Sequence, residues 1–137
     1  MPGKCFLDAN ILVYAQDRSA PKKRRTSREL IAALAESGDG VISTQVMQEF
    51  FVAVTRKLGV APIAAKGILK TFSVFEIVQV SPTLVQEAID CSILNQLAFW
   101  DSLILAAAAA AGCATAYSED LNPGQKILGV TIRNPLV

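Results

Sequence analysis

The sequence predicts an α/β protein in which a parallel β-sheet of four to five short strands is flanked by helices, as an α/β/α sandwich. Short apolar segments alternate along the chain with longer segments whose apolar residues recur at helical spacing, and this alternation is typical of parallel sheets. The 137 residues are 52% hydrophobic, which is enough for one sizeable core. We therefore expect a single domain that covers residues 1–137.

The first expected strand covers residues 4–7 and ends at Asp8, and a short apolar run follows at residues 11–15. Proline at the first turn and glycine after the last turn mark several of the helices that come next. The other expected elements are a helix at 21–36, a strand at 41–42, helices at 44–57 and 62–71, a strand at 75–80, helices at 82–94 and 100–111, and strands at 114–117 and 130–133. Residues 121–129 are expected to form a loop.

Composition narrows the classes of function. Mean hydropathy is +0.39, and no segment reaches the roughly 18 apolar residues that a membrane span needs. The chain opens without the pattern of a signal peptide, so we expect a cytoplasmic protein with no membrane partner. The high apolar fraction also suggests a buried face in a dimer or a complex. The three cysteines are far apart, lack zinc-site spacing, and are expected to be small buried side chains.

The chain contains no histidine. This absence excludes Ser-His-Asp and Cys-His catalysis and argues against most zinc hydrolases. Acid–base chemistry would therefore depend on carboxylates, metal ions, lysine or tyrosine.

Two acidic residues follow strands that can be neighbours in a parallel sheet. Asp8 follows the first strand and Asp120 follows the strand at residues 114–117. Ligand sites in such sheets form beyond the carboxyl ends of the strands, where the strand order changes direction. The two carboxylates would then meet, although Asp8 can also cap the segment after it and Asp120 can be a turn residue.

Two further acids lie on helices. Asp101 shares a helical face with Ile104, Leu105 and Ala108, where an ionised carboxylate is costly unless a cation neutralises it, although capping of the helix is the alternative. Glu49 lies off the centre of its helix's apolar face, so spacing does not distinguish a ligand from a surface residue. Converging carboxylates without histidine suit Mg²⁺ or Mn²⁺, which can promote phosphodiester cleavage.

Six of the 13 basic residues fall between Arg18 and Arg28, although the net charge is only +1. Such a block can neutralise several phosphates, and we expect four of its residues to hold a phosphate backbone beside the acidic cluster: Lys22, Lys23, Arg24 and Arg25. The alternative is a solvated loop and first helical turn.

Four segments, taken together and in this order, resemble the acidic motifs of PIN-domain ribonucleases. They are FLDANILVYA at residues 6–15, QEF at 48–50, FWDSLILAAA at 99–108 and YSEDL at 117–121. Each segment is short, but their order and spacing agree over essentially the whole chain.

The resemblance implies a PIN-like fold and an endoribonuclease that depends on Mg²⁺ or Mn²⁺. It assigns catalysis to Asp8, Glu49, Asp101 and Asp120, and metal binding to the three aspartates. Asn10 matches a polar position that orients the first acid, and Ser118 matches a small hydroxyl residue that contacts the site. The resemblance also implies a homodimer and a VapC-like toxin that a small antitoxin inhibits by filling its cleft.

Other classes fit less well. A response-regulator receiver would need paired acids after the first strand, and a haloacid-dehalogenase-like phosphatase would need an aspartate in place of Asn10. A free-standing RNA-processing nuclease and a catalytically silent interaction module remain the alternatives to a toxin. Metal-dependent RNA cleavage separates the silent module from both nucleases, and a neighbouring antitoxin gene separates the two nucleases from each other.

Overall fold

The computed structural model describes residues 3–137, which form a six-stranded sheet with six α-helices and one short 3-10 helix. In chain order the elements are β1 (Cys5–Leu7), α1 (Ala9–Tyr14), α2 (Pro21–Ser37), β2 (Gly40–Ser43), α3 (Thr44–Arg56), α4 (Pro62–Thr71), η1 (Phe72–Val74), β3 (Glu76–Val78), α5 (Pro82–Asn95), α6 (Phe99–Ala110), β4 (Thr115–Tyr117), β5 (Lys126–Ile127) and β6 (Val130–Arg133). The predicted α/β class is confirmed.

The strand order places the first strand in the middle of the sheet. The order is β3-β2-β1-β4-β6-β5, and all neighbouring pairs are parallel except β5 with β6. The chain builds outward from β1 through β2 to β3 and then continues on the other side of β1 with β4. The order therefore changes direction between β1 and β4, which is where a ligand site is expected in such a sheet.

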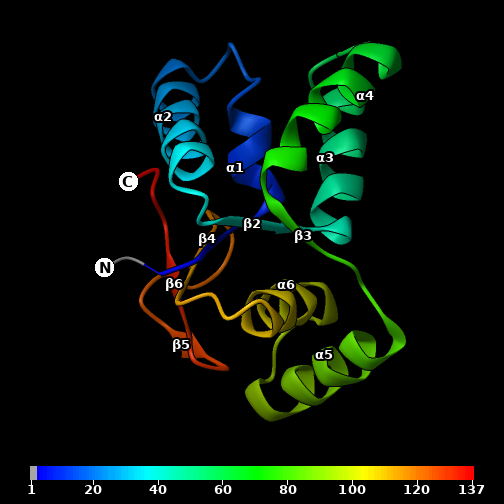
Figure 1. The fold of residues 1–137 in the computed structure, drawn as a ribbon, viewed down its shortest axis with the longest axis vertical. Coiled ribbons are helices and arrows are strands. Elements are labelled where there is room, and N and C mark those ends of the chain that lie inside the picture. The colour runs from blue at the N-terminus through cyan, green and yellow to red at the C-terminus, as the bar shows by residue number, and fades with distance from the viewer. Residues whose placement is uncertain (1–2) are drawn as a thin grey trace.

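Helices cover both faces of the sheet. Figure 1 shows α1, α2, α3 and α4 on one side of the strands and the packed pair of α5 and α6 on the other. Seven consecutive residues of α6, Ser102–Ala108, are buried, and the small alanine side chains let this helix lie close to β2, β4 and β6. The cysteines Cys5, Cys91 and Cys113 are free and buried, as predicted.

One local expectation was wrong. The sheet has six strands rather than four to five, because part of the expected loop at residues 121–129 forms β5 and pairs with β6. The turn between them has positive φ angles at Leu128 (53°) and Gly129 (80°), the geometry of a tight hairpin. Leucine rarely adopts this conformation, so the sequence lacked the usual Asn-Gly or Asp-Gly signal. The apolar run after Asp8, whose secondary structure was not predicted, is a helix, α1, that begins at Ala9.

No single helix among residues 3–137 has both the length and the apolar character to cross a membrane; α5 and α6 meet those criteria only as a pair, and they are bent by 116°.

Candidate active site

Asp8 lies at the carboxyl end of β1, directly before α1. Its Oδ1 accepts a hydrogen bond from the Ala9 backbone N–H at 2.7 Å, and its Oδ2 accepts one from the Ser118 hydroxyl at 2.7 Å. The side chain therefore caps α1 with one oxygen while the other faces β4. Because β1 and β4 are parallel neighbours, Asp8 and Asp120 come to the same edge of the sheet, as the sequence predicted.

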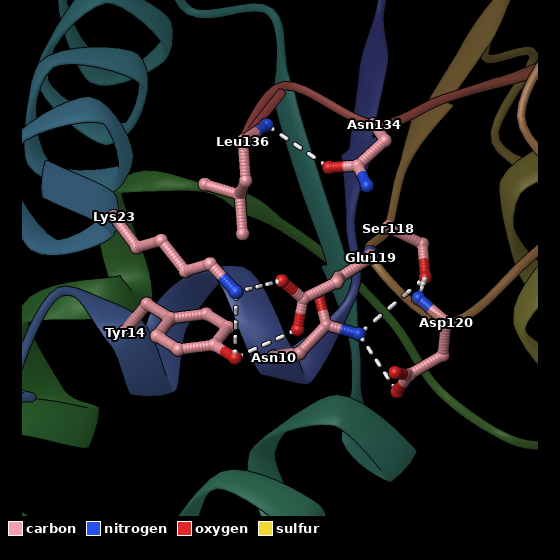
Figure 2. Close-up of polar contacts among 8 residues, drawn as sticks. All are labelled: Asn10, Tyr14, Lys23, Ser118, Glu119, Asp120, Asn134 and Leu136. Carbon is pink, nitrogen blue, oxygen red and sulfur yellow. Dashed lines mark hydrogen bonds and ion pairs between the residues drawn. The ribbon is translucent and has the colours of Figure 1, made fainter. Parts of the chain in front are cut away.

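Ser118 and Asn10 connect the first and last acidic residues. The buried Ser118 hydroxyl also accepts hydrogen bonds from the backbone N–H groups of Asp120 (3.1 Å) and Leu121 (3.3 Å), which fixes the turn after β4. Asn10 Nδ2 donates to Asp120 Oδ2 at 3.0 Å (Figure 2). The same nitrogen lies 3.4 Å from Asp8 Oδ2. Asn10 thus orients Asp120 more closely than Asp8, to which the resemblance assigned it.

Glu49 and Asp101 come from helices on opposite faces of the sheet. Glu49 lies on α3 and, with Asn10 and Asp120, lines a cleft of about 510 Å³. Asp101 lies in the first turn of α6 and, again with Asp120, lines a smaller cavity of about 160 Å³. Asp120 lines both cavities, whereas the buried Asp8 lines neither and contacts this region through Ser118.

The carboxylates influence one another's protonation. Burial is the main cause that raises the pKa of Asp8 from 3.8 to about 6; repulsion from Glu49 and Asp120 adds to it, and the hydrogen bonds from Ser118 and Ala9 oppose it. Burial also raises the pKa of Glu49 and of Asp101, with further contributions from Asp101 and Asp120 on Glu49 and from Asp120 on Asp101. Negative charge is therefore costly here.

A divalent cation would relieve that cost. Within residues 3–137, no lysine or arginine forms an ion pair with any of the four acids. Carboxylate oxygens are the ligands that Mg²⁺ and Mn²⁺ prefer, so the donor set fits such an ion in chemical type. In the same described residues, no three acidic side chains already converge closely enough to hold a metal, so binding would require them to move closer together.

The basic residues between Arg18 and Arg28 lie in two different surroundings. Lys23 Nζ donates to Glu119 Oε2 at 2.6 Å and to the Tyr14 hydroxyl at 3.4 Å, and both partners line the 510 Å³ cleft (Figure 2). Arg24 and Arg25 instead line a separate cavity on α2. Lys22 is exposed at the start of the same helix. Of the four predicted RNA-binding residues, only Lys23 contacts residues of the acidic cleft.

Several residues of this region were not predicted. Tyr14, Glu119 and Lys57 line the acidic cleft. Burial alone would raise the pKa of Glu119, but its contacts with Lys23 and Tyr14 outweigh burial, and the pKa is lowered. Gln45 Nε2 donates to Glu49 Oε2 (3.3 Å) and to the Trp100 carbonyl (3.1 Å), which ties α3 to α6. The sequence did carry one signal: Lys57 follows Glu49 by about two helical turns.

Solved structures of similar fold include three toxin or toxin–antitoxin proteins. VapC20 from Mycobacterium tuberculosis, a toxin that cleaves the sarcin-ricin loop, is 20% identical with a TM-score of 0.70, covering 85% of this chain and 92% of its own. A toxin–antitoxin complex from Klebsiella pneumoniae is 19% identical with a TM-score of 0.72, covering 96% of this chain and 98% of its own. DNA-bound VapBC from Salmonella typhimurium is 18% identical with a TM-score of 0.69, covering 97% of this chain and 98% of its own. At these identities the likeness establishes the fold alone.

Family membership rests on a match over most of the chain. No curated protein matches the chain. Residues 5–125, however, match the PIN domain, and this segment includes every one of the four acids described above. The chain belongs to the PIN domain family.

Proposed function

We propose that this protein is an endoribonuclease that cleaves RNA phosphodiester bonds with the help of Mg²⁺ or Mn²⁺. The observation that carries the proposal is the acidic cluster: of four carboxylates from four segments, three have pKa values that burial and the charges of the other acids raise, and no ion pair neutralises any of them within residues 3–137. Membership of the PIN domain family supports nuclease chemistry for such a cluster.

Each residue has a distinct role in this proposal. Asp8, Asp101 and Asp120 hold the cation, and Glu49 completes the acidic set at the α3 side of the cleft. Ser118 and Asn10 hold the carboxylates of Asp8 and Asp120 in place through the hydrogen bonds given above. When bound, a divalent cation lowers the pKa of an attacking water and stabilises negative charge on the phosphate.

The test is RNA cleavage by the purified protein. With Mg²⁺ or Mn²⁺ we expect cleavage, and with EDTA none. Asp101→Asn removes a proposed ligand from the partly exposed start of α6 and should abolish cleavage with the fold intact. Asp90→Asn removes an equal charge from the exposed surface of α5 and should leave cleavage within a few-fold of the original rate. Equal activity in both variants would refute the site.

We further propose that the protein is the toxin of a toxin–antitoxin pair. The support is the similarity to VapC20 and to the complexes from Klebsiella pneumoniae and Salmonella typhimurium. Expression alone should slow bacterial growth, and co-expression with the product of a neighbouring small gene should restore it. Harmless expression of a protein with verified nuclease activity would favour an RNA-processing role instead.

A homodimer is part of the same proposal. Helix α5 presents Ile89, Ile93 and Leu94 to solvent, the last with 80% of its surface exposed, and apolar exposure of this kind suits an interface. Light scattering should give twice the chain mass, and Leu94→Asp should give the mass of one chain if α5 forms the contact.

A further inference from the structure

A second groove lies beside the acidic cleft and shares residues with it. This groove has a volume of about 530 Å³, within the range of about 300–1,000 Å³ that small-molecule sites occupy. Its walls come from α3 and from the start of α6, and Glu49 and Lys57 line both the groove and the acidic cleft. A chain bound in one would therefore continue into the other.

The groove has an aromatic wall with a free surface. Trp100, the only tryptophan in the sequence, is 62% exposed and lies next to Asp101 in α6. Its ring meets that of Phe99 edge to face, at a centroid distance of 5.1 Å and an interplanar angle of 75°. Because most of the Trp100 side chain stays exposed despite this contact, the indole is accessible for stacking.

Two cations line the same groove. Arg56 is in the last turn of α3 and Lys57 follows it, and both side chains are exposed. Neither forms an ion pair among the residues that the structure describes. The rest of the lining combines the apolar side chains of Val52, which is 48% exposed, and Ala53 with the polar side chains of Gln45, Gln48 and Glu49.

Gln45 connects the two walls of the groove with the acidic cluster. This buried side chain donates one hydrogen bond to the backbone carbonyl of Trp100 and one to Glu49, so a single amide connects the aromatic wall with the cluster. The Trp100 backbone is fixed at this point, although its ring is exposed. The groove is thus a formed feature beside the proposed cleavage site.

A flat apolar surface with nearby cations matches the chemistry of a nucleotide, which offers a stacking base and a phosphate. We propose that this groove binds one nucleotide of single-stranded RNA next to the cleaved bond, with its base on Trp100 and its phosphate held by Arg56 and Lys57. The proposal rests on the nuclease function proposed above and adds where the neighbouring part of the substrate lies. A base-stacking contact of this kind strengthens binding with little choice of sequence.

Because Trp100 is the only tryptophan, its fluorescence reports directly on the groove. The full chain with Asp8→Asn, which keeps RNA intact in this account, is titrated in Mg²⁺ with a six-nucleotide adenosine RNA. We expect saturable quenching of the fluorescence. A hexamer with the same backbone but no bases should bind about 5- to 140-fold more weakly, which corresponds to about 1–3 kcal/mol of stacking, and should not quench.

Variants separate stacking from charge in the same Asp8→Asn background. Trp100→Ala should weaken binding of labelled RNA over that same range without changing its salt dependence, and Trp100→Phe should retain most of the affinity. Arg56→Gln with Lys57→Gln should instead reduce the slope of log affinity against log salt by about 0.7 for each phosphate that these side chains no longer neutralise. Lys66→Gln with Lys70→Gln removes equal charge from α4, outside the groove, and should leave the slope unchanged.

Each outcome decides between the proposals. RNA binding without quenching, or with unchanged affinity in Trp100→Ala, would overturn the nucleotide site, as would a complete lack of RNA binding. A change in molecular mass caused by Trp100→Ala, with RNA binding intact, would assign the groove to a second copy of the chain. Quenching by RNA together with no metal-dependent cleavage by the unmodified protein would support the groove and refute the nuclease.

Discussion

Replacing Asp8 with asparagine should stabilise the metal-free protein at neutral pH. Asp8 is 8% exposed, and its pKa rises on folding from 3.8 to about 6, mainly because burial penalises the charged form. A carboxyl with a raised pKa binds more protons in the folded than in the unfolded state between these two values. The free energy of unfolding therefore decreases as the pH rises through this window, and the full cost is present above pH 6.

The size of this cost follows from the two pKa values. At about 1.36 kcal/mol per pH unit, the difference between 3.8 and about 6 corresponds to roughly 3 kcal/mol. Asparagine keeps an oxygen that can accept the Ala9 hydrogen bond, but it carries no charge and interacts less strongly with Ser118. We therefore expect a gain of up to about 3 kcal/mol at pH 8 and little or none near pH 4.

Urea unfolding of both proteins in EDTA, at several pH values from 4 to 8, measures this difference. The gain from Asp8→Asn should increase between about pH 4 and pH 6, with a midpoint near pH 5, and should level off above that. Asp90→Asn, on the exposed surface of α5, should show no such trend. A gain that does not change with pH, or a loss of stability at pH 8, would refute the conclusion that burial destabilises the ionised Asp8.

Three further predictions concern other parts of the structure. Ser118→Ala removes a hydrogen bond that lowers the pKa of Asp8, so the acid limb of the cleavage–pH profile should move to higher pH; an unmoved limb would contradict this role. Gly40→Ala would place a Cβ 2.5 Å from the Phe75 ring and should lower the free energy of unfolding by about 1–3 kcal/mol. Gly67→Ala, in open space on α4, should instead raise the free energy of unfolding by about 0.5–1 kcal/mol, and thermal melts of both variants measure the difference. Changing Lys22, Lys23, Arg24 and Arg25 to alanine should flatten the salt dependence of RNA binding, and an unchanged slope would identify a solvated surface.

The sheet and most helices were predictable because their local patterns agree with the final fold. Asp8 and Asp120 could be placed together from topology alone, since parallel neighbouring strands end at the same edge. Strand β5 was not predictable, because its turn uses Leu128 in a conformation that leucine rarely adopts.

The surroundings of the acids were harder to predict than the acids themselves. Spacing could not place Glu49, because its environment depends on how α3 packs against α1 and on the contact from Gln45. The groove beside Trp100 depends on the meeting of α3 and α6, which are more than 40 residues apart in the sequence. Likewise, the separation of Lys23 from Arg24 and Arg25 follows from the direction of each side chain on α2.

Whether Asp8, Asp101 and Asp120 together hold a divalent cation can be measured by calorimetric titration of the purified protein with Mn²⁺. We expect saturable binding that competes with Mg²⁺, weakens by about tenfold or more in Asp101→Asn and is unchanged in Asp90→Asn. Binding of equal strength in all three proteins, or no saturable binding in any of them, would contradict this expectation.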